Sequence, residues 1–128
     1  MFYVVCSMNW IELLFLLLVG HALGDFVLQS DTMAKMKSEL IDKELRDKCN
    51  GQFNGAPYLL TWMYWLTAHA LIEGGIVYLI TGNIWIGIIE VGLHWFIDYG
   101  KTHHEYQIHA DQGLHLLCRL LYLLYMVI

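Results

Sequence analysis

The sequence predicts an all-α membrane protein, a bundle of four transmembrane helices with an amphipathic surface helix between the first and second. The chain of 128 residues is 58% hydrophobic and only 15% charged, whereas soluble domains are about 45–50% apolar and about 25% charged. It contains one Pro and little of the apolar-polar alternation typical of strands. Because only helices and closed barrels satisfy their backbone in lipid, and a barrel needs many alternating segments, we expect one helical domain, residues 1–128.

Four apolar segments are expected to cross the hydrocarbon core. The first begins at Asn9, a favourable capping residue, and Trp10 is expected to anchor it at the interface. The third and fourth are close to the lower limit of about 17 residues for a crossing helix. The predicted spans cover residues 9–29, 58–80, 84–100 and 111–128.

The connection between the first two spans, residues 30–56, is polar and charged. Within it, apolar residues recur at helical spacing, which predicts an amphipathic helix on the membrane surface. These residues are Met33, Met36, Leu40, Ile41 and Leu45. A solvated loop is the alternative.

The basic residues predict the orientation of the chain in the membrane. Five of them lie in the first connection, namely Lys35, Lys37, Lys43, Arg46 and Lys48, and Lys101 follows the third span. The positive-inside rule therefore places both of these connections in the cytoplasm and both termini outside it. The first span has no basic leader and carries His21 and Asp25, so it is not expected to be a cleaved signal. No basic stripe for nucleic acid is present.

Each predicted span carries a His and a carboxylate four residues apart. Such residues share one face of a helix. A charge that faces lipid costs at least about 2.5–3.5 kcal/mol, so these faces are expected to point into the bundle and to meet near its cytoplasmic end. The pairs are His21 with Asp25, His69 with Glu73, His94 with Asp98, and Asp111 with His115.

The charges of this group do not balance, which points to a metal. Five acids, Asp25, Glu73, Glu90, Asp98 and Asp111, stand against two bases, Lys101 and Arg119. The excess negative charge must be protonated, hydrated or neutralised by a cation. His and carboxylate together suit zinc, with iron or manganese as alternatives, as one or two ions. The predicted ligands are His21, Asp25, His69, His94, Asp98, Asp111 and His115. The alternative is a polar network that only holds the helices together.

Four segments resemble the signature of domain-of-unknown-function family 3307, which comprises small membrane proteins of bacteria and phages. They are His21-Ala22-Leu23-Gly24-Asp25-Phe26-Val27-Leu28-Gln29, His69-Ala70-Leu71-Ile72, His94-Trp95-Phe96-Ile97-Asp98-Tyr99-Gly100-Lys101 and Asp111-Gln112-Gly113-Leu114-His115. The resemblance covers the chain from Met8. It implies the fold, a bacterial inner-membrane location and the importance of the matching positions, but no activity. One departure is Glu73, where the family pattern has another His, so Glu73 is not counted among the ligands. The chain is also similar, by analogy alone, to membrane-bound metal-dependent hydrolases.

The leading hypothesis is a metal-dependent hydrolase that acts on a membrane lipid or another amphiphile from the cytoplasmic leaflet. Glu90 is the predicted general acid or base, and Lys101 or Arg119 is expected to hold an anionic headgroup or the developing oxyanion. Gln29 and Gln112 are the predicted substrate-binding residues. Two alternatives stay open: a conduit for metal ions or protons, and a non-catalytic phage or host protein that modulates a partner through the first connection. Four short helices also leave room for a homo-oligomer.

Overall fold

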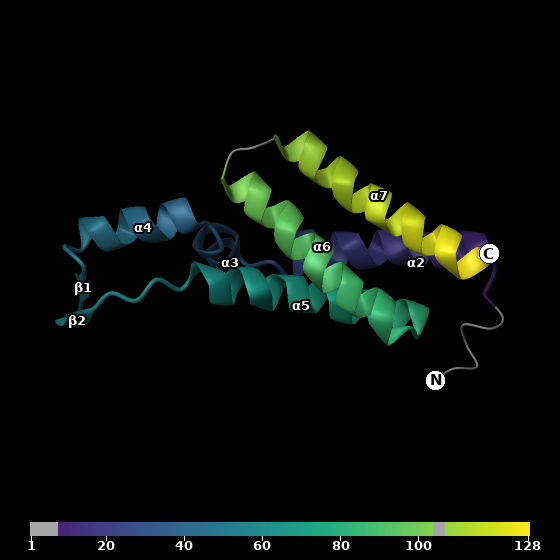
Figure 1. Ribbon diagram of the computed structural model, residues 1–128, viewed down its shortest axis with the longest axis horizontal. Helices are drawn as coiled ribbons and strands as arrows, with labels where there is room; N and C mark the ends of the chain where they lie inside the picture. The colour runs from purple at the N-terminus through teal and green to yellow at the C-terminus, as the bar shows by residue number, and fades with distance from the viewer. Residues whose placement is uncertain (1–7, 104–106) are drawn as a thin grey trace.

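The computed structural model describes residues 8–103 and 107–128, and this part of the chain is helical apart from a short hairpin (Figure 1). The all-α prediction is therefore confirmed. The elements are α2 (Trp10–Ala22), the π-helical turn η1 (Leu23–Val27), α3 (Asp31–Met36), α4 (Glu39–Lys48), β1 (Gln52–Phe53), β2 (Ala56–Pro57), α5 (Trp62–Thr81), α6 (Ile84–Thr102) and α7 (Ile108–Val127).

The four long helices run alternately in opposite directions and pack side by side, while α4 and the hairpin extend beyond one end of the bundle (Figure 1). Local signals set the helix ends. Asn9 and Glu12 form a capping box at the start of α2. Gly82, at φ 66°, ends α5 in the left-handed conformation that glycine adopts without strain, and Asn83 caps α6 directly after it. This tight turn makes α5 and α6 antiparallel neighbours.

The interior of the bundle divides into an apolar half and a polar half. The apolar cluster lies at the end distant from α4 and includes Leu13, Leu17, Val77, Ile86 and Leu123. The other half holds buried imidazole and carboxylate groups. Large apolar side chains instead cover the outside of the helices, with Phe15 63% exposed, Phe96 70% and Leu117 51%. This distribution, polar inside and apolar outside, is the reverse of that in a water-soluble domain.

Among the described residues, two helical segments are long and apolar enough to cross a membrane, Trp10–Val27 and Trp62–Thr81. They coincide with the first and second predicted spans and point to an association with a membrane. The helices α6 and α7 carry more charge, and the charged residues that interrupt their hydropathy, among them Glu90, Asp98 and Arg119, are buried inside the bundle.

The connection after η1 forms two helices and a hairpin instead of one amphipathic helix. Ser30 caps α3, and Ser38 interrupts the segment because its hydroxyl accepts the Ile41 N–H and starts α4. The strands β1 and β2 pair antiparallel across Asn54 and Gly55, which have φ values of 52° and 80°. An Asn-Gly pair is the residue signal for this hairpin turn, and it was readable in the sequence.

A buried carboxylate attaches α4 to the bundle. Asp42 is 0% exposed and accepts hydrogen bonds from the Thr61 and Trp62 N–H groups at 2.5 and 2.9 Å and from the Tyr58 hydroxyl at 2.8 Å. Thr61 provides no side-chain cap of its own, so Asp42 satisfies the free amides at the start of α5. The helix consequently begins at Trp62, later than the predicted 58.

Candidate metal centre

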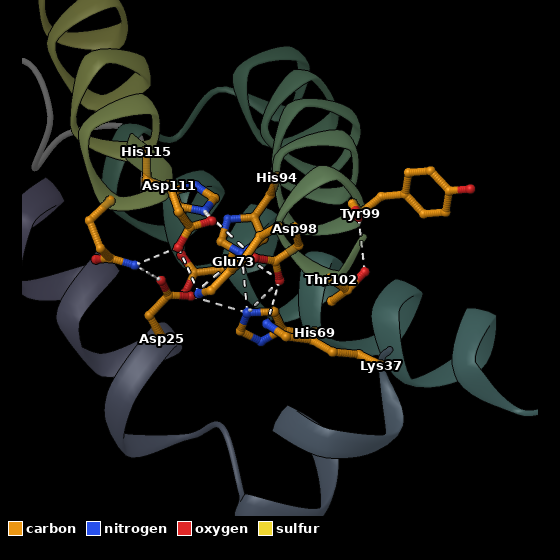
Figure 2. A network of polar contacts seen from close by, with 12 residues as sticks. Asp25, Lys37, His69, Glu73, His94, Asp98, Tyr99, Thr102, Asp111 and His115 are labelled. Carbon is orange, nitrogen blue, oxygen red and sulfur yellow. Dashed lines mark hydrogen bonds and ion pairs between the residues drawn. The ribbon is translucent and has the colours of Figure 1, made fainter. Parts of the chain in front are cut away.

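The polar faces of the four long helices meet at the end of the bundle beside α3, and all seven predicted ligands lie there. Figure 2 shows these ligands other than His21. Apart from His21, at 5%, and the Asp25 side chain, at 6%, the ligands are no more than 1% exposed. Residues from four separate helices are therefore brought together in a space that excludes most solvent.

The π-helical turn explains how α2 presents Asp25. The Leu28 N–H bonds to the Leu23 carbonyl at 2.8 Å, five residues back, so the helix widens around Gly24 and Asp25. Gly24 allows a close approach, because a Cβ there would overlap the carboxylate of Glu73 on α5 unless that side chain moved. The Gly24-Asp25 sequence thus has a structural explanation. Without a side chain on Gly24, the carboxylate of Glu73 can approach the backbone that carries Asp25.

The closest group of candidate ligand atoms joins η1, α5 and α6. His69 Nε2 lies 3.1 Å from Asp25 Oδ1 and 3.1 Å from His94 Nε2, and His94 Nε2 lies 3.5 Å from the same Asp25 oxygen. Asp98 Oδ2 lies 3.4 Å from His69 Nε2 and 3.7 Å from His94 Nε2. Ligand atoms at about 2.0–2.2 Å from a tetrahedral zinc lie about 3.3–3.6 Å from each other. The spacing around the two imidazole nitrogens therefore suits a metal held by Asp25, His69 and His94, with Asp98 Oδ2 beside them, and we call these four side chains the first site.

The hydrogen-bond partner of His94 Nδ1 determines which nitrogen of this imidazole is free to bind a metal. Nδ1 lies 3.2 Å from Glu90 Oε1, and because a carboxylate only accepts, Nδ1 carries the proton. The lone pair of a neutral His94 is then on Nε2, directed toward Asp25. An imidazole held by a second carboxylate in this way is the usual partner arrangement of a metal-binding His. Acceptor atoms that face one another in a buried space need a proton or a cation between them.

The remaining predicted ligands lie beside this group. His115 stacks on His94 with ring centroids 4.1 Å apart. Asp111, one helical turn earlier, accepts from Lys101 at 2.7 Å. His21 Nε2 lies 3.8 Å from Asp25 Oδ2. Three of the four predicted His and carboxylate pairs thus face each other within their own helix, whereas His69 and Glu73 turn to different partners.

Two of the three predicted catalytic residues, Glu90 and Arg119, lie in a buried ion-pair network beside the first site, whereas Lys101 lies in the wall of a cleft and contacts Asp111. Arg119 contacts Glu73 Oε2 at 2.7 Å and Glu90 Oε1 at 2.8 Å, and the Tyr122 hydroxyl donates to Glu90 Oε2 at 2.7 Å. Both oxygens of Glu90 therefore have partners, which suits a residue that orients His94. The acid-base role expected of Glu90 and the oxyanion role expected of Arg119 stay predictions.

The two predicted substrate-binding glutamines contact candidate ligands. Gln29 Nε2 lies 3.1 Å from His69 Nε2. Gln112 Nε2 donates to Asp25 Oδ2 at 3.0 Å and to Asp111 Oδ2 at 3.2 Å. Gln112 therefore connects α7 to η1, while Gln29 lies at the wall of a neighbouring cleft.

Lys37 belongs to the cluster although the sequence indicated only a basic residue of the first connection. It is 4% exposed and its Nζ lies 2.5 Å from Asp98 Oδ2 (Figure 2). The following Ser38 was the available signal, since a cap there ends α3 and turns Lys37 inward. With Lys37 included, the described cluster holds five carboxylates and three cations, which leaves two negative charges in excess.

Glu73 was also left out of the predicted site. Its Oε1 is buried, lies within the group formed with His21 and Asp25, and has no hydrogen-bond partner among the described residues. This unpartnered Glu73 oxygen lies against Gly24. Glu73 therefore adds an acid to the site.

A cleft of about 700 Å³ lies between α3, α4 and the ends of α6 and α7. Its wall includes Gln29 and Lys37, which contact the first site, and Lys101, which contacts Asp111. Leu40 and Ile41 give it an apolar side.

Residues 13–48 match the model of a family described as protein of unknown function (DUF3307). This match confirms the resemblance seen in the sequence, over the segment from α2 to α4 that contains His21, Asp25 and Lys37. No curated protein and no solved structure matches the chain.

Proposed function

We propose that this protein is a membrane-embedded, metal-dependent hydrolase that acts on a lipid or another amphiphile. The observation that carries the proposal is the first site, in which the Asp25 and Asp98 oxygens each lie 3.1–3.7 Å from both imidazole nitrogens, and these nitrogens lie 3.1 Å from each other. Zinc, iron or manganese bound there would act as a Lewis acid and activate water for attack on an ester, amide or phosphoester.

The side chains around the first site have distinct parts in this proposal. Glu90 holds the Nδ1 proton of His94 and so keeps Nε2 available as a ligand. Glu73, with its unpartnered Oε1, is the carboxylate placed to accept or return a proton. Lys101, whose side chain is 29% exposed in the cleft wall, brings a positive charge toward an anionic headgroup.

The proposal places the whole bundle in the bacterial inner membrane, with α2–η1, α5, α6 and α7 as four spans. The cleft and α4 then lie on the cytoplasmic side, and both ends of the chain lie outside it. The apolar exterior supports this placement, because the outward faces of α6 and α7 carry residues such as Ile88, Phe96 and Leu117.

The alternative of an ion conduit is less well supported by the interior of the bundle. A polar path needs to continue through the membrane, but beyond Arg119 and Tyr122 the space between the helices is filled by Leu13, Leu17 and Val77. A polar chamber that is closed at one end suits a reaction site better than a passage.

Metal analysis and lipid turnover by the detergent-purified protein test the proposal together. We expect bound zinc, iron or manganese in the wild type and hydrolysis of a bacterial lipid extract that a chelator abolishes and the metal restores. His94→Ala should lose both metal and activity. The matched control is His103→Gln, because His103 lies outside the buried cluster and contacts Glu39 instead. Metal-free protein after loading, or ion flux into proteoliposomes without lipid turnover, would overturn the proposal.

A further inference from the structure

Three buried atoms next to the first site face each other without partners. They are Asp98 Oδ1, Asp111 Oδ1 and His115 Nε2, and none has a hydrogen-bond partner among residues 8–103 and 107–128. His115 Nε2 lies 3.7 Å from the Asp98 oxygen and 3.6 Å from the Asp111 oxygen. All three side chains are at most 1% exposed. A buried polar atom without a hydrogen-bond partner is unfavourable, so such a group calls for an explanation.

The other oxygen of each carboxylate is already held in place. Asp111 Oδ2 accepts from Lys101 at 2.7 Å and from Gln112 at 3.2 Å. Asp98 Oδ2 is bound by Lys37 at 2.5 Å. These contacts fix both carboxylates so that their Oδ1 atoms point toward His115, as supporting residues do around metal ligands. His115 is itself fixed by stacking on His94.

We infer that Asp98 Oδ1, Asp111 Oδ1 and His115 Nε2 form a second divalent-metal site, so that the protein holds a two-metal centre with Asp98 as the shared carboxylate. The inference rests on the proposed function, because Asp98 Oδ2 belongs to the first site. Two carboxylates and one imidazole are a ligand set that zinc and manganese accept. Three protein ligands also leave a coordination position open, as in catalytic metal sites.

The position of the second site also bears on the substrate. Lys101 and Gln29 both line the cleft, one holding Asp111 and the other contacting His69. A group that enters the cleft therefore meets, on one side, residues that contact ligands of both sites. Adjacent metal pairs act in phosphatases and nucleases by stabilising the attacking and leaving oxygens, so the chemical class that the pair favours is a phosphoester of an amphiphile.

The number of metal ions per chain tests the second site separately from activity. Purified protein is stripped with chelator, titrated with Zn²⁺ and analysed for tightly bound metal, and a parallel sample is loaded with Mn²⁺ for electron paramagnetic resonance. We expect about two ions per chain and the spectrum of a coupled pair in the wild type. His115→Gln and Asp111→Asn should each retain about one ion and lose the coupling, whereas His103→Gln should match the wild type. Using two conservative variants on one helix guards against a folding failure in either.

The outcomes separate the two proposals. About one ion in the wild type, lost with His94→Ala and unchanged by His115→Gln, would overturn the second site and leave the first intact. Two ions without turnover of a phosphoester amphiphile would support the second site and count against the hydrolase. A wild type that binds no metal would overturn both.

Discussion

At the scale of single residues, the distinctive feature is a buried lysine at the end of α3 that neutralises a buried carboxylate. Lys37 ends α3, and its ammonium lies against Asp98 at 2.5 Å. Both side chains are nearly inaccessible, at 5% and 1% exposure. An ion pair in such surroundings is costly to form, but removing one partner is costlier still, because the other charge is left without compensation.

Replacing Lys37 with Met is therefore expected to destabilise the metal-free protein by about 3–5 kcal/mol. The substitution keeps the apolar stem and removes the charge, so Asp98 remains buried without its partner. Thermal unfolding in detergent, in the presence of chelator, should show a lower midpoint for Lys37→Met than for the wild type. Added Zn²⁺ should recover part of the loss, since a cation beside Asp98 replaces the missing charge.

Lys35→Met is the matched control, because Lys35 is on the same short helix and is exposed. It should unfold at the wild-type temperature. Equal midpoints for both variants would show that Lys37 does not compensate Asp98.

The candidate site could be predicted from the sequence to the extent that its residues share helical faces. His94 with Asp98, and Asp111 with His115, are set by four-residue spacing alone. Lys37 and Glu73 could not be assigned in this way. The inward turn of Lys37 depends on the break at Ser38, and the free oxygen of Glu73 depends on the contact with Gly24 across two helices.

At the scale of the elements, the segment between η1 and α5 attaches to the bundle through hydrogen bonds to Asp42. Burial of an apolar face contributes less here, because Leu40 and Ile41 remain 43% and 37% exposed. Periodicity in the sequence could predict helices in this segment, but the division at Ser38 and the Asn54-Gly55 hairpin follow from local capping and turn chemistry. The role of Asp42 could not be predicted, because its partners lie 16 to 20 residues further along the chain.

The bond from Tyr58 to Asp42 makes the stability of this attachment depend on pH. Tyr58 precedes the apolar segment of α5, and its hydrogen bond to Asp42, together with burial, raises the pKa of its hydroxyl to about 12. In an unfolded chain the pKa of tyrosine is about 10. The folded state therefore holds the proton more tightly, and the contribution of this bond is complete below pH 10 and is lost as the pH rises through about 12.

Comparing the wild type with Tyr58→Phe across the alkaline range checks this expectation. At pH 8 the variant should be less stable by about 1.5–3 kcal/mol, the usual contribution of a hydrogen bond to a charged group. The difference should shrink above pH 10 and approach zero near the raised pKa. Tyr64→Phe, at a residue that is 77% exposed, controls for the loss of a phenol. A stability difference between the wild type and Tyr58→Phe that persists unchanged above the raised pKa would contradict the role given to the Tyr58–Asp42 hydrogen bond.

At the scale of the whole molecule, the fold places its polar groups in one half of the interior and its apolar groups at the other end and over the outside. This arrangement needs an apolar solvent around the bundle. Composition could predict it, because a chain that is 58% hydrophobic has more apolar side chains than so small an interior can hold. Hydropathy identifies two of the four long helices, α2–η1 and α5, as candidate spans among the described residues, while α6 and α7 carry buried charges that lower their mean hydropathy.

Accessibility of introduced cysteines distinguishes four spans from two. In a background without native cysteines, we expect Gln52→Cys and Gln107→Cys to react with a membrane-impermeant maleimide only after spheroplasts are opened. Asn83→Cys and Ile128→Cys should react in intact spheroplasts. The decisive position is Gln107, an exposed residue between α6 and α7. If only α2–η1 and α5 cross the membrane, Gln107 lies on the same side as Asn83 and reacts without opening. In that case the buried cluster would be held by two helices in lipid and two outside it, and the cleft could no longer face the cytoplasmic leaflet.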